Sequence, residues 1–165
     1  MCQADPLSYL SQVTGLASLP RLVIQHKPIK CAAEFKVPNR IYLDFRQPVA
    51  YMALSVAHET AHLLLRRHRW SKQPGVNQVI RQYGQSSTKY HYTREGTIEQ
   101  VLSILLQLSY ENRFCIRKFS EVHARKLMKI MGVWPMGQPF LKRWPSFLKG
   151  REGLIVWLRK NLSES

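Results

Sequence analysis

The sequence predicts an α+β fold in which a small three-stranded antiparallel sheet packs on a long central helix, with further helices following. Three short runs rich in β-branched and aromatic residues lie close together between Arg21 and Phe45. An almost entirely apolar stretch from Val49 to Leu65 has the length and composition of a buried helix. Helical patterns then alternate with loops that contain Gly and Pro over the rest of the chain.

The first half of the chain carries clear local signals. Asp5 and Pro6 predict the start of a helix over residues 6–17. Links that contain Pro28 and Pro38 separate the three strands, and they favour antiparallel pairing because they are too short for crossovers. The strands are expected at residues 21–26, 31–37 and 40–45.

The second half is expected to be helical, with loops at its Gly- and Pro-rich segments. Thr93 is a suitable cap for a helix from Arg94 to Arg113, and Gly132 ends a basic helix over residues 119–131. The other expected elements are a loop over 69–90 with a short helix at 76–83, an irregular arm over 134–150, and an amphipathic helix over 154–162. We expect residues 1–133 to form the main domain and residues 134–165 to pack on it.

The composition describes a folded, basic protein. The chain has 165 residues, of which 45% are hydrophobic, and a formal net charge of +15. That hydrophobic content excludes a disordered chain, and no apolar run is long enough for a membrane span. The first ten residues lack the basic region of a signal peptide. Three widely spaced cysteines, which support neither a disulfide framework nor a zinc ribbon, favour a cytoplasmic protein.

The expected central helix contains the sequence His58-Glu59-Thr60-Ala61-His62. Residues four apart lie on one face of a helix, so both imidazoles can reach one metal ion. Two histidines and a glutamate in an apolar helix would be costly without partners. The pattern therefore predicts a zinc site in which a carboxylate next to the ion acts as general base.

A catalytic zinc site needs a third protein ligand. His68 has the spacing of a metzincin third histidine, but on a continuing helix it would point away from the site. Glu99 is the favoured candidate because a carboxylate within an apolar stripe needs a cation, and Glu95 lies one turn before it. The glutamate that does not bind the metal is expected to orient a ligand histidine. His91 is a weaker candidate.

The H-E-x-x-H segment, with three short strands before it and a glutamate-bearing helix after it, resembles the zincin-like metallopeptidases of the gluzincin-type ImmA/IrrE group. The resemblance covers about residues 20–110. It implies a small cytosolic zinc peptidase that acts on a protein partner, often a repressor or a regulator.

The expected reaction is hydrolysis of a peptide bond in a cytosolic protein. Zinc would activate a water molecule, and Glu59 would accept its proton as general base. Donors for the developing oxyanion are expected just before the glutamate helix. The candidates are Tyr90, His91, Tyr92 and Arg94. Strand 40–45 could bind an extended peptide by strand addition.

The basic C-terminal segment suggests a polyanionic partner such as DNA. Cations and aromatic residues alternate there, which suits contact with phosphates and stacking on bases. The candidates are Lys142, Arg143, Trp144, Lys149 and Arg151. The alternative is that the aromatic side chains anchor this segment to the core. A non-enzymatic, nucleic-acid-binding or regulatory protein with a structural or sensory zinc site therefore stays open as an alternative function.

Overall fold

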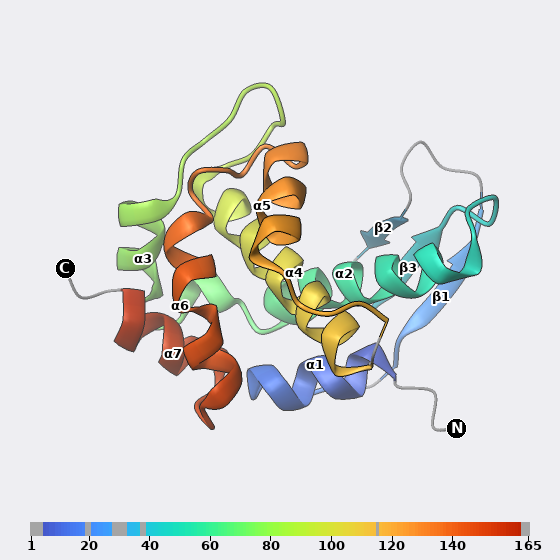
Figure 1. Ribbon diagram of the computed structural model, residues 1–165, viewed down its shortest axis with the longest axis horizontal. Coiled ribbons are helices and arrows are strands. Elements are labelled where there is room, and N and C mark those ends of the chain that lie inside the picture. The colour runs from blue at the N-terminus through green and yellow to red at the C-terminus, as the bar shows by residue number, and fades with distance from the viewer. Residues whose placement is uncertain (1–4, 19–20, 28–32, 37–38, 115, 163–165) are drawn as a thin grey trace.

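The computed structural model describes residues 5–18, 21–27, 33–36, 39–114 and 116–162. Its helices are α1 (Pro6–Thr14), α2 (Val49–Arg67), α3 (Val76–Tyr83), α4 (Arg94–Arg113), α5 (Glu121–Ile130), α6 (Gln138–Lys149) and α7 (Leu154–Leu162), with a 3₁₀ turn η1 (Trp70–Lys72). Its strands are β1 (Val23–His26), β2 (Ala33–Lys36) and β3 (Arg40–Leu43). The sheet lies at one end of the molecule, and α3, α6 and α7 lie at the other (Figure 1). The α+β prediction is confirmed.

The sheet is mixed, so the expectation of antiparallel pairing throughout is wrong. Among the described strands the order is β1-β3-β2, with β1 parallel to β3 and β2 antiparallel to β3. The parallel pair is possible because residues 27–39 separate β1 from β3, a stretch long enough for a crossover. The strand expected at 40–45 is therefore central, and β1 and β2 are the edge strands among those described. Residues 31, 32 and 37 of the second expected strand lie outside the described residues, as do all three cysteines.

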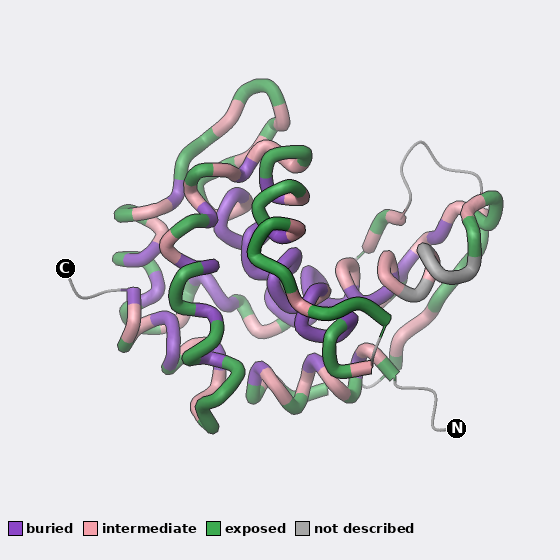
Figure 2. The backbone as a smooth tube through the Cα atoms, viewed as in Figure 1, coloured by how far each residue is buried: buried purple, intermediate pink, exposed green. Residues whose placement is uncertain are grey.

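The core is formed mainly between α2 and α4. Residues 97–106 of α4 are all buried, so α4 passes through the middle of the molecule (Figure 2). The facing part of α2 is buried over residues 60–65. Burying two long apolar faces against each other is the dominant stabilising contribution in a helical layer of this kind. It also places the H-E-x-x-H segment against α4.

The helix ends follow the local signals of the sequence. Both side-chain oxygens of Asp5 accept hydrogen bonds from the first turn of α1, and the Thr93 hydroxyl accepts one from Gly96 in α4. Helix α1 stops at Thr14, earlier than expected, because Gly15 adopts a left-handed conformation there.

The segment 134–150 contains a helix, α6, and the expectation of an irregular arm is wrong. Pro139 lies in the first turn of the helix. Backbone N–H groups there have no partner within the helix, so the lack of one in proline costs no hydrogen bond. Phe140, Trp144 and Phe147 then form one buried stripe, which joins the same core as α4. No described helix is both long and apolar enough to cross a membrane.

Candidate metal centre

The two histidines of the motif face each other on α2. The Nε2 atoms of His58 and His62 lie 3.2 Å apart. Two ligands at about 2.0–2.1 Å from a tetrahedral zinc ion lie about 3.3 Å apart, so this separation fits two corners of such a site. The spacing of four residues produces the arrangement because both side chains leave the same helix face, one turn apart.

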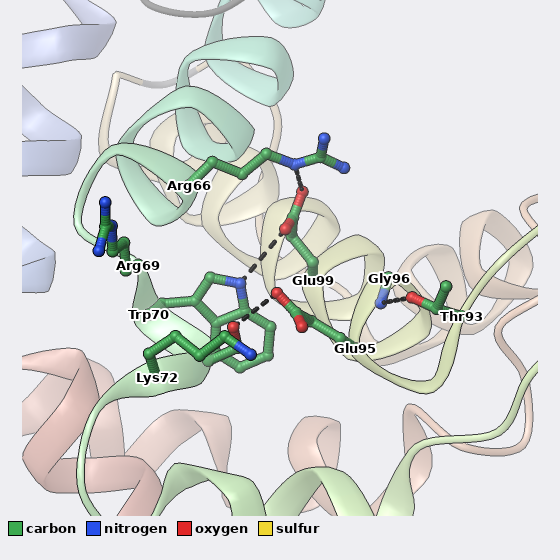
Figure 3. Close-up of a pocket in the computed structure, with 9 residues that line it drawn as sticks. Arg66, Arg69, Trp70, Lys72, Thr93, Glu95, Gly96 and Glu99 are labelled. Atoms are coloured by element: carbon green, nitrogen blue, oxygen red, sulfur yellow. Dashed lines mark hydrogen bonds and ion pairs between the residues drawn. The ribbon is translucent and has the colours of Figure 1, made fainter.

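The His62 ring is held from its other nitrogen by α4. Its Nδ1 lies 2.7 Å from Oε1 of Glu99, a carboxylate that also accepts hydrogen bonds from Nε of Arg66 and Nε1 of Trp70. Figure 3 shows Glu99 between the Arg66 and Trp70 side chains. Burial alone would raise the pKa of Glu99, but its bonds and charge pairing with His62 and Arg66 outweigh burial and lower it.

An ionised Glu99 can accept a hydrogen bond from Nδ1 of His62. This contact favours one tautomer of the ring. The tautomer that fits this contact carries its proton on Nδ1, because an ionised carboxylate oxygen can only accept, and the Nε2 atom then faces Nε2 of His58. On the face of the ring, Phe35 of β2 stacks on His62 with centroids 5.4 Å apart and planes inclined by 14°. Contacts from α4 and β2 together therefore set the ring orientation.

His58 lies in a more apolar setting. Its Nε2 is 3.1 Å from Nε2 of Gln100, and its Nδ1 has no hydrogen-bond partner of good geometry among the described residues. Burial, and then the nearby His62, lower the pKa of His58 to about 3, while the Gln107 side chain beside the ring acts in the opposite direction. The ring is therefore neutral at physiological pH, the form that binds metal ions.

Glu59 is also largely removed from water. Burial raises its pKa above the ordinary range, and the charge of Glu34 adds to this effect. The His62 ring, a hydrogen bond from the Phe35 backbone and the charge of Arg66 act in the opposite direction. A carboxylate with a raised pKa next to two histidines is the environment expected of a proton-transferring group.

His58 and Glu59 line a cleft of about 420 Å³ between α2, α4 and α5. Apolar side chains such as Leu54, Ile104 and Leu127 form much of its wall. Polar residues that the sequence argument missed also line it, among them Gln107, Glu111, Arg117 and His123. Polar residues spaced by three or four positions in the otherwise apolar α4, at 100, 103, 107 and 111, are the signal that could have found part of this set.

The predicted third ligands do not converge on the two Nε2 atoms. Glu99 lies on the Nδ1 side of His62, away from His58. Glu95 accepts a hydrogen bond from the Ser71 hydroxyl (Figure 3). His68 lies at the end of α2, with Nε2 2.7 Å from the Ala17 carbonyl oxygen. Within the described residues, no group of three or more His, Cys, Asp or Glu side chains is arranged to hold a metal ion.

The predicted oxyanion donors lie elsewhere. Tyr90 and Tyr92 stack on each other in a turn closed by a bridge between Ser87 and Tyr92, and the Tyr90 ring packs against Gly132. None of the predicted donors lines the cleft at His58: Tyr90, His91, Tyr92 and Arg94. The turn that precedes α4 therefore contributes none of the residues that line this cleft.

The nucleic-acid candidates are only partly accessible. Trp144 is fully buried, and its indole N–H donates to the Ser109 hydroxyl, so it is not available for stacking on bases. The four cations, Lys142, Arg143, Lys149 and Arg151, are exposed. Their positions suit contact with phosphates but not an interleaved stacking surface.

In comparisons with known proteins, no family model, no curated protein and no solved structure matches this chain.

Proposed function

We propose that this chain is a zinc-dependent metallopeptidase whose metal is held by His58 and His62. The observation that carries the proposal is the 3.2 Å separation of the two Nε2 atoms, together with Glu59, which lines the same largely apolar cleft as His58. A purely structural metal site has no need of a carboxylate, here the half-buried Glu59, between its histidines in the sequence. The resemblance of the H-E-x-x-H segment to the zincin-like group supports this proposal.

Zinc, when bound, polarises a carbonyl and activates water. The chain's own residues supply the proton transfer and the orientation. Glu59 accepts a proton from the attacking water and passes it to the leaving amine, and its raised pKa brings it closer to the working pH. Glu99 keeps the Nδ1 proton of His62 in place, which supports an orienting role for Glu99 and not a direct ligand role.

The edge strand β2 is the proposed place for an extended substrate. It is antiparallel to β3 on one side, and the Phe35 backbone amide points to Glu59 on the other. A peptide that added to this edge would bring its own backbone beside Glu59. This role falls to β2 and not to the segment 40–45, because β3 is paired on both sides.

The experiment is a comparison of proteins in which only the general base is changed. Wild type, Glu59→Gln and the exposed control Glu121→Gln are produced in matched cells, and shortened proteins are identified by proteomics. We expect fragments with wild type and Glu121→Gln, and a loss of 10² or more in cleavage rate with Glu59→Gln. Identical fragment sets from all three proteins would reject the enzymatic role.

A second candidate function is charge-driven binding of a polyanion without catalysis. It is favoured by the net charge of +15 and by the exposed cations on and after α6. Because Trp144 is buried, such binding would depend on phosphate contacts and would be strongly salt-dependent.

A further inference from the structure

The geometry points to a subsite for a basic side chain in the cleft, with Glu111 as the residue that recognises the cation. This inference rests on the proposed peptidase function, and it names the class of substrate: a peptide with Lys or Arg close to the bond that is cut. The subsite is separate from the histidine pair but opens into the same cleft.

Glu111 is a buried carboxylate with unused capacity to accept hydrogen bonds. Its side chain lines the cleft although the residue is only 1% exposed. Oε1 accepts one hydrogen bond, from Nε2 of Gln107 at 3.0 Å, and Oε2 has no hydrogen-bond partner among the described residues. A buried carboxylate oxygen without a donor is costly, and a cationic ligand would remove that cost.

The cleft matches the shape of a long basic side chain. Gln107 lies beside the His58 ring, and Glu111 follows one helical turn later, about 6 Å along α4. Leu127 and Met131 of the adjoining segment line the same cleft. Apolar walls of this kind suit the methylene stem of Lys or Arg, while the charged end reaches the carboxylate.

Arg117 is the internal competitor for this carboxylate. Its Nε lies 3.8 Å from Oε2 of Glu111, too far for a hydrogen bond, and its side chain is 49% exposed. Its guanidinium also donates to Nε2 of His123 at 2.8 Å. A half-exposed arginine at this distance holds the carboxylate weakly, so a substrate cation can displace it.

The experiment measures peptide binding to metal-free protein, so that it does not depend on catalysis. A fluorescent hexapeptide with one central Arg and alanine elsewhere is compared with the same peptide carrying citrulline, which has the same shape without the charge. Binding is followed by anisotropy at 0.15 M salt, where the Debye length of about 8 Å screens the general positive charge. The variants are Glu111→Gln, Arg117→Gln and the exposed control Glu121→Gln.

We expect wild type and Glu121→Gln to bind the Arg peptide at least tenfold more tightly than the citrulline peptide. Glu111→Gln should bind both equally, and Arg117→Gln should increase the preference because it removes the competing cation. If Glu111→Gln does not fold, the Arg117→Gln result decides. Equal binding of the two peptides by wild type, or an unchanged preference in Arg117→Gln, would overturn the subsite.

Failure of the subsite and failure of the proposed function give different results. A preference for the Arg peptide in a protein that cleaves nothing when loaded with zinc would reject the peptidase and keep the subsite. Cleavage of cellular proteins that depends on Glu59, without any preference for basic residues in binding, would keep the peptidase and reject the subsite.

Discussion

Nδ1 of His62 lies 2.7 Å from Oε1 of Glu99, so this hydrogen bond links the motif helix α2 to α4 across 37 positions of the chain. The bond is charge-assisted and buried, which makes it stronger than a neutral bond at the surface. The Glu99 carboxylate contacts the Nδ1 side of the His62 ring, and the Nε2 side of the ring faces His58. The orientation of the proposed metal site therefore depends on α4 as much as on the motif.

Replacing Glu99 with Gln should weaken zinc binding by about tenfold or more, because the carboxylate that orients the His62 ring is lost. The matched change Glu95→Gln should have little effect, since Glu95 bonds to Ser71. Competition with a fluorescent chelator measures both affinities. Equal losses in the two variants would contradict the separate roles of the two glutamates.

The metal-free protein should lose stability as the pH falls from about 6.5 toward 3, partly because of His58. The folded-state pKa of His58, about 3, lies below the unfolded value of 6.5. Its stabilising contribution is therefore complete above pH 6.5 and decreases by up to about 1.4 kcal/mol per pH unit below it. Urea unfolding with a chelator present measures this slope.

The control for this measurement is the difference between wild type and a His58→Gln variant across the same pH range. The difference in free energy of unfolding between wild type and His58→Gln should shrink as the pH falls below about 6.5. A His26→Gln variant, altered at an exposed strand position, should give the same pH profile as wild type. Parallel profiles for wild type and His58→Gln would show that His58 is not held neutral by its surroundings.

Replacing Glu59 with Gln should stabilise the metal-free protein at pH 7. Burial raises the pKa of Glu59, so keeping it ionised at neutral pH costs about 1.4 kcal/mol for each unit of that rise. The gain should disappear as the pH falls below about 4.5, where the carboxyl group is protonated in both states. A destabilised Glu59→Gln protein at pH 7 would mean that the carboxylate makes stronger interactions than its burial costs.

Polyanion binding should follow the exposed cations of α6 and the residues after it. Changing Lys142, Arg143, Lys149 and Arg151 to Gln should reduce the slope of log K against log salt on duplex DNA by about 0.9 per lost phosphate contact. These variants are preferable to removal of residues 134–165, because Phe140 and Trp144 belong to the common core. An unchanged slope, or no binding by wild type at low salt, would reject this partner.

Much of the fold could be predicted from local signals. The helix over 94–113 is predictable with its bounds. Thr93 marks its start as an N-cap, and the apolar run that follows has the length of a long helix. The pairing of the strands could not be predicted, because β1 pairs with β3 and the strand between them in sequence forms the far edge. Such pairing depends on how the sheet packs on α2. The short segments between consecutive strands carry no information about that packing.

The site was predictable only where its residues share one helix. His58, Glu59 and His62 follow from the geometry of α2 alone. The cleft residues Glu111 and Arg117 reach the site through the packing of α4 and the segment after it, and no spacing rule relates them to the motif. Trp144 shows the converse: its alternation with cations left both a binding surface and an anchor to the core open, and only tertiary packing shows that the ring is buried.

The measurement that tests the central claim most directly is the zinc content of the purified protein. Equilibrium dialysis against zinc, followed by elemental analysis, is made on wild type, Glu59→Gln and the double variant His58→Ala, His62→Ala. We expect about one zinc per chain in wild type and Glu59→Gln, and almost none in the double variant. Full zinc retention by the double variant, or a wild-type protein that binds none, would contradict the account.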